Sequence, residues 1–431
     1  MEREKFLWSI FWGVVILSII GGMMSVSVWK DIKRSAYESD VLSYRAQVDL
    51  MEARKEIAAR KEIRLERERE LAALAEKEKL PRFVAPPKPD MKKMKHLGCV
   101  ADGLLSDYGD ESKKMARYID RSKCYYLHRA LETWLEAPDF DKAMKIKKEI
   151  TRTDVVYGMF LAEAINKNTE YFFSEENRYF NFGDMCRDGS DNDWGEHTCK
   201  PSFASEEYRK YLREITRRAM DMGIQSFMFG QIHFQESKNL DPAWARIIVT
   251  DMRAYAEWLG MDIVIGAQTN DIDDGSYLGL FDYIEGGVGI DARGGFPRND
   301  SCHPRWWQKR GDWCWALLWH DRFAKKAKNV FLHLDWSGKI GDDMSHFTRM
   351  GDADRARTLE DLYDFFTAKG NGFLLPVLAR LSIENNGCTG ITKHFYSPQK
   401  EFGCNDERTI DDIFSSWSKS QPALSPQEHK E

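Results

Sequence analysis

Six segments of the chain have the pattern of buried strands, and amphipathic helices lie between several of them. The strand-like segments are rich in Val, Ile, Leu and Phe, and they cover residues 154–163, 224–234, 262–270, 281–287, 329–336 and 372–380. Helical periodicity covers residues 205–223, 242–260, 305–327 and 357–370. Repeated strand, helix, strand order indicates a parallel sheet covered by helices, either a closed barrel or a doubly wound sheet.

The absence of nucleotide-binding glycine motifs favours the barrel. Neither GxGxxG nor GxxxxGK[ST] follows any of the strand segments, and doubly wound nucleotide-binding folds carry such motifs. The expected fold class is therefore α/β, a (β/α)8 TIM barrel. Six segments fall short of eight strands, so we expect the remaining two in less regular stretches such as 391–397 or 171–182.

Five of the strand segments begin apolar and finish polar. Residues 227–236 read FMFGQIHFQE, a run whose alternate side chains change from Phe to Gln and His. The alternation places on one face of each strand, in order, Tyr157, Met159, Leu161 and Glu163; Phe227, Phe229, Gln231, His233 and Gln235; Gln268 and Asn270; Tyr283 and Glu285; Phe331, His333 and Asp335. This asymmetry predicts a packed barrel interior that opens into a polar site at the carboxyl ends of the strands.

The chain before residue 95 has a different composition. Residues 6–29 form an uncharged run of the length a bilayer-spanning helix needs, with Trp8 and Trp29 near its ends. No A-x-A site follows this run, so a single-pass anchor in membrane lipid is favoured over a cleaved signal peptide. Residues 1–29 would then be a short cytoplasmic tail and a transmembrane anchor.

A helical stalk and a proline-rich linker are expected after the anchor. Residues 30–80 are rich in Ala, Glu, Lys, Arg and Leu and nearly lack Gly and Pro. Val41, Tyr44, Val48 and Met51 keep coiled-coil spacing, which leaves open both a solvated spacer and a homodimer through the stalk. Residues 81–94 open with four prolines and predict an extended linker. The catalytic domain would cover residues 95–420, and residues 421–431 would be a disordered tail.

The cysteines indicate an oxidising compartment. All 8 lie from residue 99 onward and none forms a CxxC motif. We expect disulfides between neighbours in the sequence: Cys99 with Cys124, Cys186 with Cys199, Cys302 with Cys314, and Cys388 with Cys404. The three basic residues after the apolar run, at 30, 33 and 34, outnumber the two before it, at 3 and 5. By the positive-inside rule this weakly favours a C-terminal domain on the cytoplasmic side. The cysteines outweigh that margin of one charge, so the C-terminal domain is expected on the extracytoplasmic side of the cell membrane.

Charge and aromatic content narrow the expected partners. The net charge of −6 argues against a nucleic-acid partner. Carboxylates, amides and imidazoles near one point, in a chain with 14 Trp, suit carbohydrate, because polar groups grip hydroxyls and indole faces pack against sugar rings. The aromatic candidates for this role lie in or beside the loops after strands, and they are Trp194, Trp306, Trp307 and Trp336.

At the strand ends FGQIHFQE, GAQTND, YIEGG and HLDW the chain resembles glycoside hydrolases of the (β/α)8-barrel type, over about residues 150–385. The resemblance is architectural, and the DxxDxDxE pattern of chitinase-like barrels is missing. It implies a polysaccharide or glycan substrate and two catalytic carboxylates: Glu285 as acid, Asp335 as nucleophile or base, and Glu236 as the substitute for either. The expected substrate-binding residues are Glu163, Gln231, His233, Gln235, Gln268, Asn270, His333, Trp306 and Trp336.

Three alternatives stay open on the sequence alone. The first is a catalytically inactive barrel that binds a glycan or a surface partner. The second is a type II membrane glycosyltransferase that uses the DxD motif at Asp271 and Asp273. The third is a metal-dependent hydrolase with ligands among His233, His320, His333 and Asp335. No cofactor or metal is expected for the hydrolase, although the DxD motif and the acidic loop 187–197 leave Mn²⁺ or Ca²⁺ open.

Overall fold

The structure is a computed structural model that describes most of the chain from residue 84 onward. It describes residues 84–236, 242–270, 272–296, 298, 318–335, 343–381, 388 and 395–420, and a few helical residues between 47 and 61. The predicted anchor at 6–29, most of the stalk, Cys302 and Cys314, Trp306 and Trp336, and the tail at 421–431 lie outside these residues. In the part of the chain that is described, no helix has the length and apolar character to cross a bilayer.

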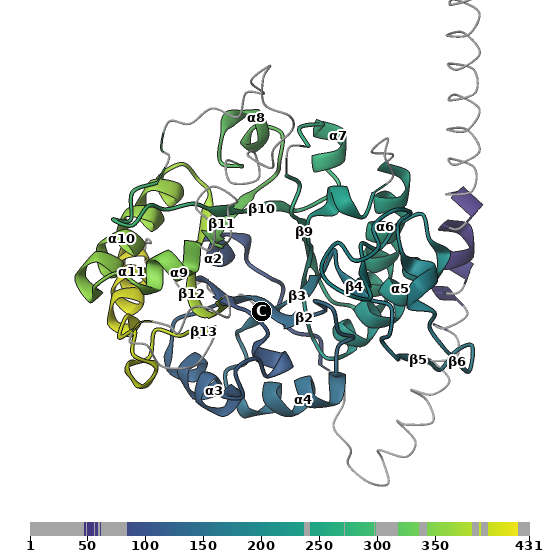
Figure 1. The fold of residues 1–431 in the computed structure, drawn as a ribbon, viewed down its shortest axis with the longest axis horizontal. Helices are drawn as coiled ribbons and strands as arrows, with labels where there is room; N and C mark the ends of the chain where they lie inside the picture. The colour runs from purple at the N-terminus through teal and green to yellow at the C-terminus, as the bar shows by residue number, and fades with distance from the viewer. Residues whose placement is uncertain are drawn as a thin grey trace, which may run out of the picture. The chain divides into compact units, whose positions relative to one another are not determined.

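Eight parallel strands close into a barrel within the unit Ile63–Glu431. The strands are β1 (Gly98–Ala101), β2 (Tyr126–Glu132), β3 (Val156–Leu161), β8 (Ser226–Phe229), β9 (Val264–Ala267), β10 (Tyr283–Val288), β11 (Val330–Leu334) and β12 (Gly372–Arg380). Each pairs in parallel with the next, and β12 pairs with β1 to complete the ring (Figure 1). The (β/α)8 barrel predicted from the sequence is confirmed.

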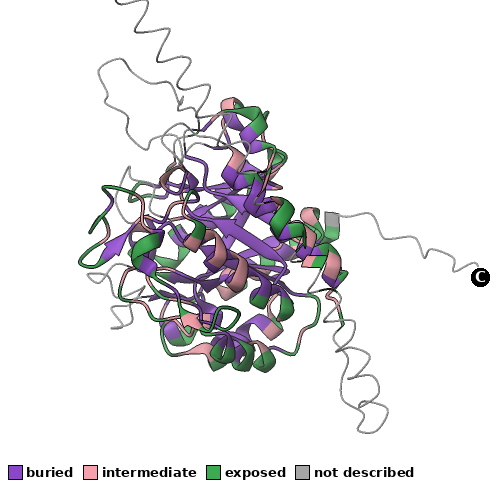
Figure 2. Cartoon of the chain, turned by 90° about the vertical axis from the view of Figure 1, so that its right-hand side faces the viewer, coloured by how far each residue is buried: buried purple, intermediate pink, exposed green. Residues whose placement is uncertain are grey.

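Helices surround the ring of strands, apart from α2, which appears within the ring in the view of Figure 1. The helices are α2 (Met91–His96), α3 (Ser112–Arg121), α4 (Phe140–Glu149), α5 (Glu206–Asp221), α6 (Pro242–Leu259), α7 (Gly275–Leu278), α8 (Asp321–Ala324), α9 (Asp343–Thr348), α10 (Asp352–Ala368) and α11 (Glu407–Ser420). Short 3₁₀ turns lie at Leu104–Ser106, Phe182–Met185, Ile232–Phe234 and Lys400–Phe402. Figure 2 shows buried strands inside and exposed residues on the outer helix faces, as expected for amphipathic helices on a barrel.

The six strand segments read from the sequence are all barrel strands, but the other two were sought in the wrong places. The missing strands are β1 and β2, which precede all six, so the barrel begins at Gly98 and not near residue 150. Residues 391–397 supply only β13 (Phe395–Tyr396), which pairs antiparallel with the end of β12. Residues 171–182 supply the hairpin β5 (Phe172–Phe173) and β6 (Arg178–Tyr179), outside the barrel. A further short pair joins β4 (Ile165–Asn166) to β7 (Thr198–Cys199).

The predicted inward face is right for two strands and wrong for two others. Tyr283 and Phe331 belong to the interior cluster, as expected for β10 and β11. On β3 and β8, however, Phe160 and Met228 occupy the interior, so the alternation runs opposite to the prediction. Phe229 instead packs edge-on against Phe203 outside the ring. The apolar runs of these strands are buried on both faces, and periodicity alone cannot then tell inside from outside.

Three of the four predicted disulfides are present in the described residues. Cys99 pairs with Cys124 and ties the start of β1 to the residues before β2. Cys186 pairs with Cys199 in the long loop after β3, and Cys388 pairs with Cys404 near the C-terminal end. The prediction for these three pairs is confirmed, and the Cys302–Cys314 pair lies outside the described residues.

Gly98, at the start of β1, occupies a position with no room for a side chain. A Cβ atom there would lie 2.3 Å from Cδ2 of Leu374 and 2.5 Å from the backbone oxygen of Met94. We expect Gly98→Ala to lower the free energy of unfolding by about 1–3 kcal/mol, because a backbone oxygen of α2 cannot move aside without displacing the helix. Denaturant unfolding measures this. Gly275→Ala, where the nearest atom lies 3.9 Å away, is the control and is expected to change little.

Candidate active site

A cavity of about 830 Å³ opens at the carboxyl ends of the barrel strands. It lies where the strand-end pattern predicted a site, because the carboxyl ends of parallel strands meet at one mouth. It is lined by Asp102, Tyr108, Gly109, Asp110, Arg129, Glu132, Trp134, Leu135, Glu136, Phe160, Glu163, Trp194, Gln231, Gln268, Asp335, Leu378, Arg380 and Phe395. Carboxylates outnumber cations in this lining, and two amides and two indole rings complete its chemistry.

An irregularity in β2 directs Arg129 into the cavity. The pairing of β2 with β3 shifts between Leu127 and Leu131, so that three residues of β2 lie opposite a single residue of β3. Arg129 lies inside this bulge and has φ of 56°, a backbone conformation that a non-glycine residue adopts at a cost of about 1 kcal/mol or more. Bulges of this kind re-aim side chains beside functional sites. Here Arg129, within the bulge, and Glu132, at the end of the same strand, both line the cavity.

The guanidinium of Arg129 holds three carboxylates around it. Its Nε lies 2.9 Å from Glu132 and 3.3 Å from Asp102, and its Nη1 lies 3.2 Å from Asp335. The same group lies 4.3 Å from the ring centre of Phe160, in cation–π contact. Three strand ends, those of β1, β2 and β11, are therefore joined through one cation. Removal of this cation would leave three neighbouring carboxylates to repel one another at low dielectric.

Burial makes several of these carboxyl groups hard to ionise. Burial raises the pKa of Asp102 to about 7, with the charge of Glu132 adding to the effect and that of Arg129 opposing it. Burial also raises the pKa of Glu132, again against Arg129. The pKa of Glu163 is raised by burial to about 7. A carboxyl group that keeps its proton near neutral pH can act as a general acid.

Glu163 follows β3 and lines the cavity, although its side chain is almost fully buried. It is 1% exposed, and its Oε1 accepts a hydrogen bond of 2.7 Å from Nε2 of Gln231. Its Oε2 is buried without a hydrogen-bond partner in the structure. Gly230 makes room for it, since a Cβ atom at that residue would lie 2.2 Å from this oxygen. One oxygen of Glu163 is thus fixed by an amide, and the other is left for a group in the cavity.

Glu285 lies beneath the cavity and does not line it. Its side chain is fully buried, and its Oε1 contacts Nε2 of His333, which lies on the neighbouring strand β11. Burial opposes protonation of His333, but the negative charge of Glu285 outweighs it and raises the pKa of His333 to about 9. His128, on β2, lies beside this pair with its ring 5.3 Å from that of His333. Burial and the positive charges of His333 and Arg129 lower the pKa of His128 well below its usual range.

Asp335 follows β11 and lies at the boundary between the cavity and this deeper group. Its side chain is 32% exposed, and its Oδ2 contacts Arg129 at 3.2 Å and lies 3.9 Å from Nε2 of His333. It is the one predicted catalytic carboxylate that lines the cavity.

Glu236 lies away from the cavity lining. It is fully buried after the short turn that follows β8, and its Oε1 accepts a hydrogen bond of 2.8 Å from the hydroxyl of Tyr277 in α7. Its neighbour Gln235 bonds to the hydroxyl of Tyr208 and the backbone oxygen of Gly230. Strand β8 ends at Phe229, so residues after it no longer alternate as the sequence pattern assumed.

The other predicted binding residues divide into two groups. Gln231 and Gln268 line the cavity, and Oε1 of Gln268 accepts a hydrogen bond of 3.1 Å from the backbone nitrogen of Gln231. His233 and Asn270 contact each other at 3.5 Å and are not part of the lining. Trp306 and Trp336 lie outside the described residues.

The DxD motif is engaged in contacts between loops. Asp273 forms an ion pair of 2.7 Å with Arg322, and Asp274 caps α7 by accepting a hydrogen bond from the backbone nitrogen of Tyr277. Neither lines the cavity, and Asp271 lies outside the described residues. His320 caps α8 through the backbone nitrogen of Arg322. His320 is not among the residues that line the cavity.

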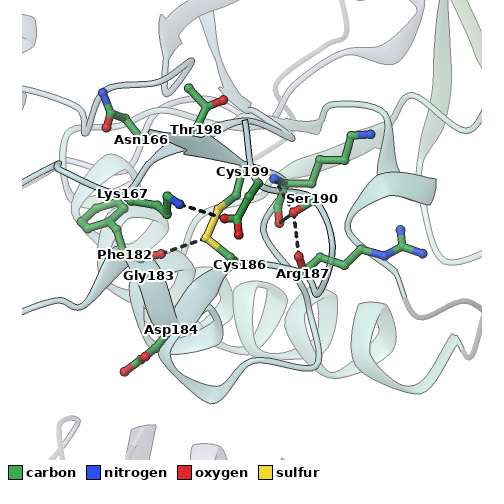
Figure 3. The surroundings of a disulfide bond; sticks show 12 residues. Asn166, Lys167, Phe182, Gly183, Asp184, Cys186, Arg187, Ser190, Thr198 and Cys199 are labelled. Carbon is green, nitrogen blue, oxygen red and sulfur yellow. Dashed lines mark hydrogen bonds and ion pairs between the residues drawn. A yellow bond between two sulfur atoms is a disulfide. The ribbon is translucent and has the colours of Figure 1, made fainter. Parts of the chain in front are cut away.

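A disulfide braces the long loop between β3 and α5, which carries Trp194 to the cavity. The ring of Trp194 lies edge-on to that of Trp134 with 5.2 Å between centres. Figure 3 shows the bond between Cys186 and Cys199 among the polar contacts of the loop. The hydroxyl of Ser190 donates to the backbone oxygen of Arg187 at 2.7 Å in the same turn. The disulfide adds a covalent link to the short strand pairs and turns of this loop, and so further limits its freedom.

Sequence reasoning missed Asp102, Arg129, Glu132 and Trp134 because it missed β1 and β2. It also passed over Arg380, the last residue of β12, although that strand was found. Strand β2 reads YLHRALE, and its polar centre broke the apolar pattern used to find strands. A polar interruption in a run of otherwise buried residues was the available signal.

Comparison with known proteins yields structural neighbours only. No family model matches the chain, and no curated protein matches it. Among solved structures, the GH27 β-L-arabinopyranosidase from Geobacillus stearothermophilus is 13% identical with a TM-score of 0.30, over 47% of this chain and 52% of that one. This chain therefore spans about half the length of that structure.

Two further neighbours are also glycoside hydrolases. The glycoside hydrolase domain of PelA from Pseudomonas aeruginosa is 9% identical with a TM-score of 0.34, over 61% of this chain and 89% of that one. The α-galactosidase TtGalA from Thermus thermophilus, in complex with p-nitrophenyl α-D-galactopyranoside, is 11% identical with a TM-score of 0.38, over 77% of this chain and 62% of that one. These scores are low, so the fold assignment rests on the closed ring of eight parallel strands.

The raised pKa of Glu163 predicts a stability that falls as pH rises. Its folded-state pKa of about 7 lies above its ordinary value of 4.5, so the folded state binds the proton more tightly than the unfolded state does. Ionisation of Glu163 therefore lowers the stability of the folded state. This loss is absent at a pH below the ordinary pKa, grows as pH rises between the two pKa values, and is complete above a pH of about 7. We expect Glu163→Gln to gain up to about 3 kcal/mol over wild type between pH 4 and pH 8, by chemical denaturation.

Glu136→Gln makes the same chemical change at an exposed carboxylate on the cavity rim and serves as the control. A gain of similar size for both variants, or none for Glu163→Gln, would contradict the assignment of a buried proton to Glu163.

The bond between Cys186 and Cys199 is expected to protect the loop that carries Trp194. Replacing both cysteines with serine should raise the rate of proteolytic cleavage within residues 187–198 and lower stability by up to about 3 kcal/mol, since a loop of this length loses its closure. Limited proteolysis with mass spectrometry measures the cleavage sites. The variant Cys388→Ser with Cys404→Ser is the control, and it should leave this loop uncut. Equal cleavage in both variants would count against a local bracing role.

Proposed function

We propose that the chain is a glycoside hydrolase whose active site is the cavity at the mouth of the barrel. One observation carries the proposal: carboxyl groups from the ends of four strands, Asp102, Glu132, Glu163 and Asp335, line a single cavity together with amide and indole side chains. Hydrolysis of a glycosidic bond needs one carboxyl group that keeps its proton and a second that is ionised. A cavity built only to bind a neutral glycan has no need for so many buried acids.

Glu163 suits the role of general acid better than Glu285, the residue favoured by the sequence pattern. It lines the cavity, whereas Glu285 lies beneath it in contact with His333. Its pKa, raised by burial to about 7, keeps it protonated in mildly acidic to neutral solution. Its Oε2 faces no other hydrogen-bond partner, so a proton on this oxygen is available to the oxygen of the leaving sugar.

Asp335 suits the role of the ionised partner, as nucleophile or as base towards water. It is the most exposed of these four acids, and its ion pair with Arg129 holds the carboxylate in place. In the proposed reaction Glu163 protonates the leaving oxygen while Asp335 either attacks the anomeric carbon or takes a proton from the attacking water. Water supplies the hydroxyl group of the new reducing end.

The remaining lining groups suit a polysaccharide or glycan substrate. Trp134 and Trp194 offer apolar faces against which sugar rings pack. The amides of Gln231 and Gln268 line the same cavity, and amide groups can both donate hydrogen bonds to hydroxyl groups and accept them. These groups come from four different loops, as is usual for substrate recognition on this barrel.

We also propose an extracytoplasmic, membrane-anchored location for this enzyme. The uncharged run at residues 6–29 and the helix-forming composition of residues 30–80 support an anchor followed by a stalk. The three disulfides support an oxidising compartment for the barrel. A homodimer through the stalk belongs to the same proposal and rests on the coiled-coil spacing alone.

The test compares release of reducing ends from a panel of neutral and charged polysaccharides. We expect Glu163→Gln and Asp335→Asn each to lower kcat by about 10²–10⁴-fold, because each removes one of the two groups that move protons or bonds. Wild-type activity should fall as pH rises through about 7, where Glu163 loses its proton. In Glu163→Gln most of the turnover should be lost, and the remaining activity should no longer fall as pH rises through about 7.

Glu236→Gln is the matched control, because it neutralises a buried carboxylate that does not line the cavity. It should keep turnover, since the hydroxyl of Tyr277 can still donate to the amide oxygen. Glycan binding without release of reducing ends from any polysaccharide would instead support a catalytically inactive binding barrel. Retained turnover in both Glu163→Gln and Asp335→Asn would overturn the assignment of roles.

A further inference from the structure

Three buried side chains from three strands converge beneath the cavity. They are His128 on β2, Glu285 on β10 and His333 on β11, and one ligand atom from each lies within 4.8 Å of the others. All three are almost entirely shielded from solvent, with exposures of 0%, 0% and 1%. The catalytic roles proposed above use none of them, so the group needs a separate explanation.

Both imidazole rings are held through Nδ1, which leaves Nε2 as the ring nitrogen that can bind a ligand. Nδ1 of His333 lies 3.2 Å from the backbone oxygen of Leu334, and because a carbonyl oxygen can only accept, Nδ1 must carry the proton. Nδ1 of His128 lies 3.0 Å from the hydroxyl of Tyr126, which can orient that ring in the same way. Histidine ligands of metal ions are held by just such contacts on the nitrogen that does not bind the metal.

Two of the inward atoms lack any hydrogen-bond partner in the structure. These are Nε2 of His128 and Oε2 of Glu285, both fully buried. Buried polar atoms without partners are destabilising by about 1–3 kcal/mol each, so a protein rarely keeps two of them in one buried group. A contact between Oε1 of Glu285 and Nε2 of His333 satisfies only one pair of atoms in the group.

The surrounding charge favours an added cation. Glu285 lies under a cavity that is lined by several carboxylates. One of them is Asp335, whose Oδ2 lies 3.9 Å from Nε2 of His333. Among the described residues, the guanidinium groups in the cavity lining are those of Arg380 and Arg129, and Arg129 already contacts three carboxylates. A divalent ion next to Glu285 would offset the excess of negative charge at the mouth.

We propose that His128, Glu285 and His333 bind one divalent transition-metal ion through Nε2, a carboxylate oxygen and Nε2. Two nitrogen ligands and one oxygen ligand match zinc and related ions and disfavour calcium and magnesium, which take oxygen ligands. The ion would join β2, β10 and β11 directly beneath Asp335 and Arg129. It would thereby brace the strand ends that carry the cavity's carboxylates.

The experiment measures metal bound to the full-length protein after chelator treatment and titration with Zn²⁺. We expect one ion per chain by elemental analysis after gel filtration, and a rise in Tm when Zn²⁺ is added to the chelated protein. Substitution with Co²⁺ should give a visible absorption spectrum typical of nitrogen and oxygen ligands in low coordination. Absence of bound metal in the wild type, with no change in Tm, would overturn the proposal and leave a proton shared between His333 and Glu285.

Variants separate this group from other sites on the chain. His128→Gln and Glu285→Gln should abolish stoichiometric binding, and Tyr126→Phe, which removes only the hydroxyl beside Nδ1 of His128, should weaken it by about 10–100-fold. Glu236→Gln and His197→Gln, a buried acid and an exposed histidine outside the group, should bind like the wild type. If Glu285→Gln fails to fold, Tyr126→Phe and the Co²⁺ spectrum still decide. Unchanged binding in His128→Gln and Tyr126→Phe would place the metal elsewhere and refute the assignment.

Discussion

The contacts of Arg129 with Asp102, Glu132 and Asp335 are the interaction on which the mouth of this barrel depends. Two of the acids lie at the ends of the neighbouring strands β1 and β2, and the third follows β11, which is separated from β1 by β12. Without a cation between them, the mutual repulsion of the three carboxylates would push the strand ends apart. To put the guanidinium there the chain accepts a bulge in β2 and a residue with positive φ. The strained backbone at Arg129 is thus what allows three acids to lie close together around one cation.

The barrel interior is layered from its core to its mouth. Tyr126, Ser226 and Tyr283 form a buried hydroxyl network, with 3.0 Å between the first two and 3.1 Å between the two tyrosines. Above it lie His128, Glu285 and His333, and above these lie Arg129 and the carboxylates of the cavity. Each layer orients the next, since Tyr126 contacts His128 and His333 lies near Asp335. Acids such as Glu163 are destabilising where they lie, which is typical of groups kept for function.

The sequence was sufficient to predict the class of fold and the end of the barrel at which a site would form. Six strands could be found because their apolar runs are bounded by glycine or polar residues, and Tyr283, Glu285, Phe331 and His333 were placed on the correct faces. Strand β1 reads GCVA and holds a single β-branched residue, and β2 contains His128 and Arg129 at its centre, so neither matched an apolar template. The residues that hide β2 are the ones that build the site. Local patterning fails where function requires a departure from it.

The choice among carboxylates could not be made from the sequence, because burial and contacts decide it. Glu163, Glu236 and Glu285 all follow or end apolar runs, yet one lines the cavity, one bonds to Tyr277 and one contacts His333. The strand β8 stops at Phe229, and the turn after it breaks the alternation that had linked Gln231, His233 and Gln235. Only the fold shows that Gln231 supports Glu163 while Gln235 packs against Tyr208.

The most direct test of the account is a crystal structure of the Asp335→Asn variant soaked with oligosaccharide fragments. The account predicts a sugar chain across the cavity, with a ring against Trp134 or Trp194 and a glycosidic oxygen within hydrogen-bonding distance of Oε2 of Glu163. A glycan bound outside this cavity, or bound there with its glycosidic oxygens out of reach of Glu163, would contradict it.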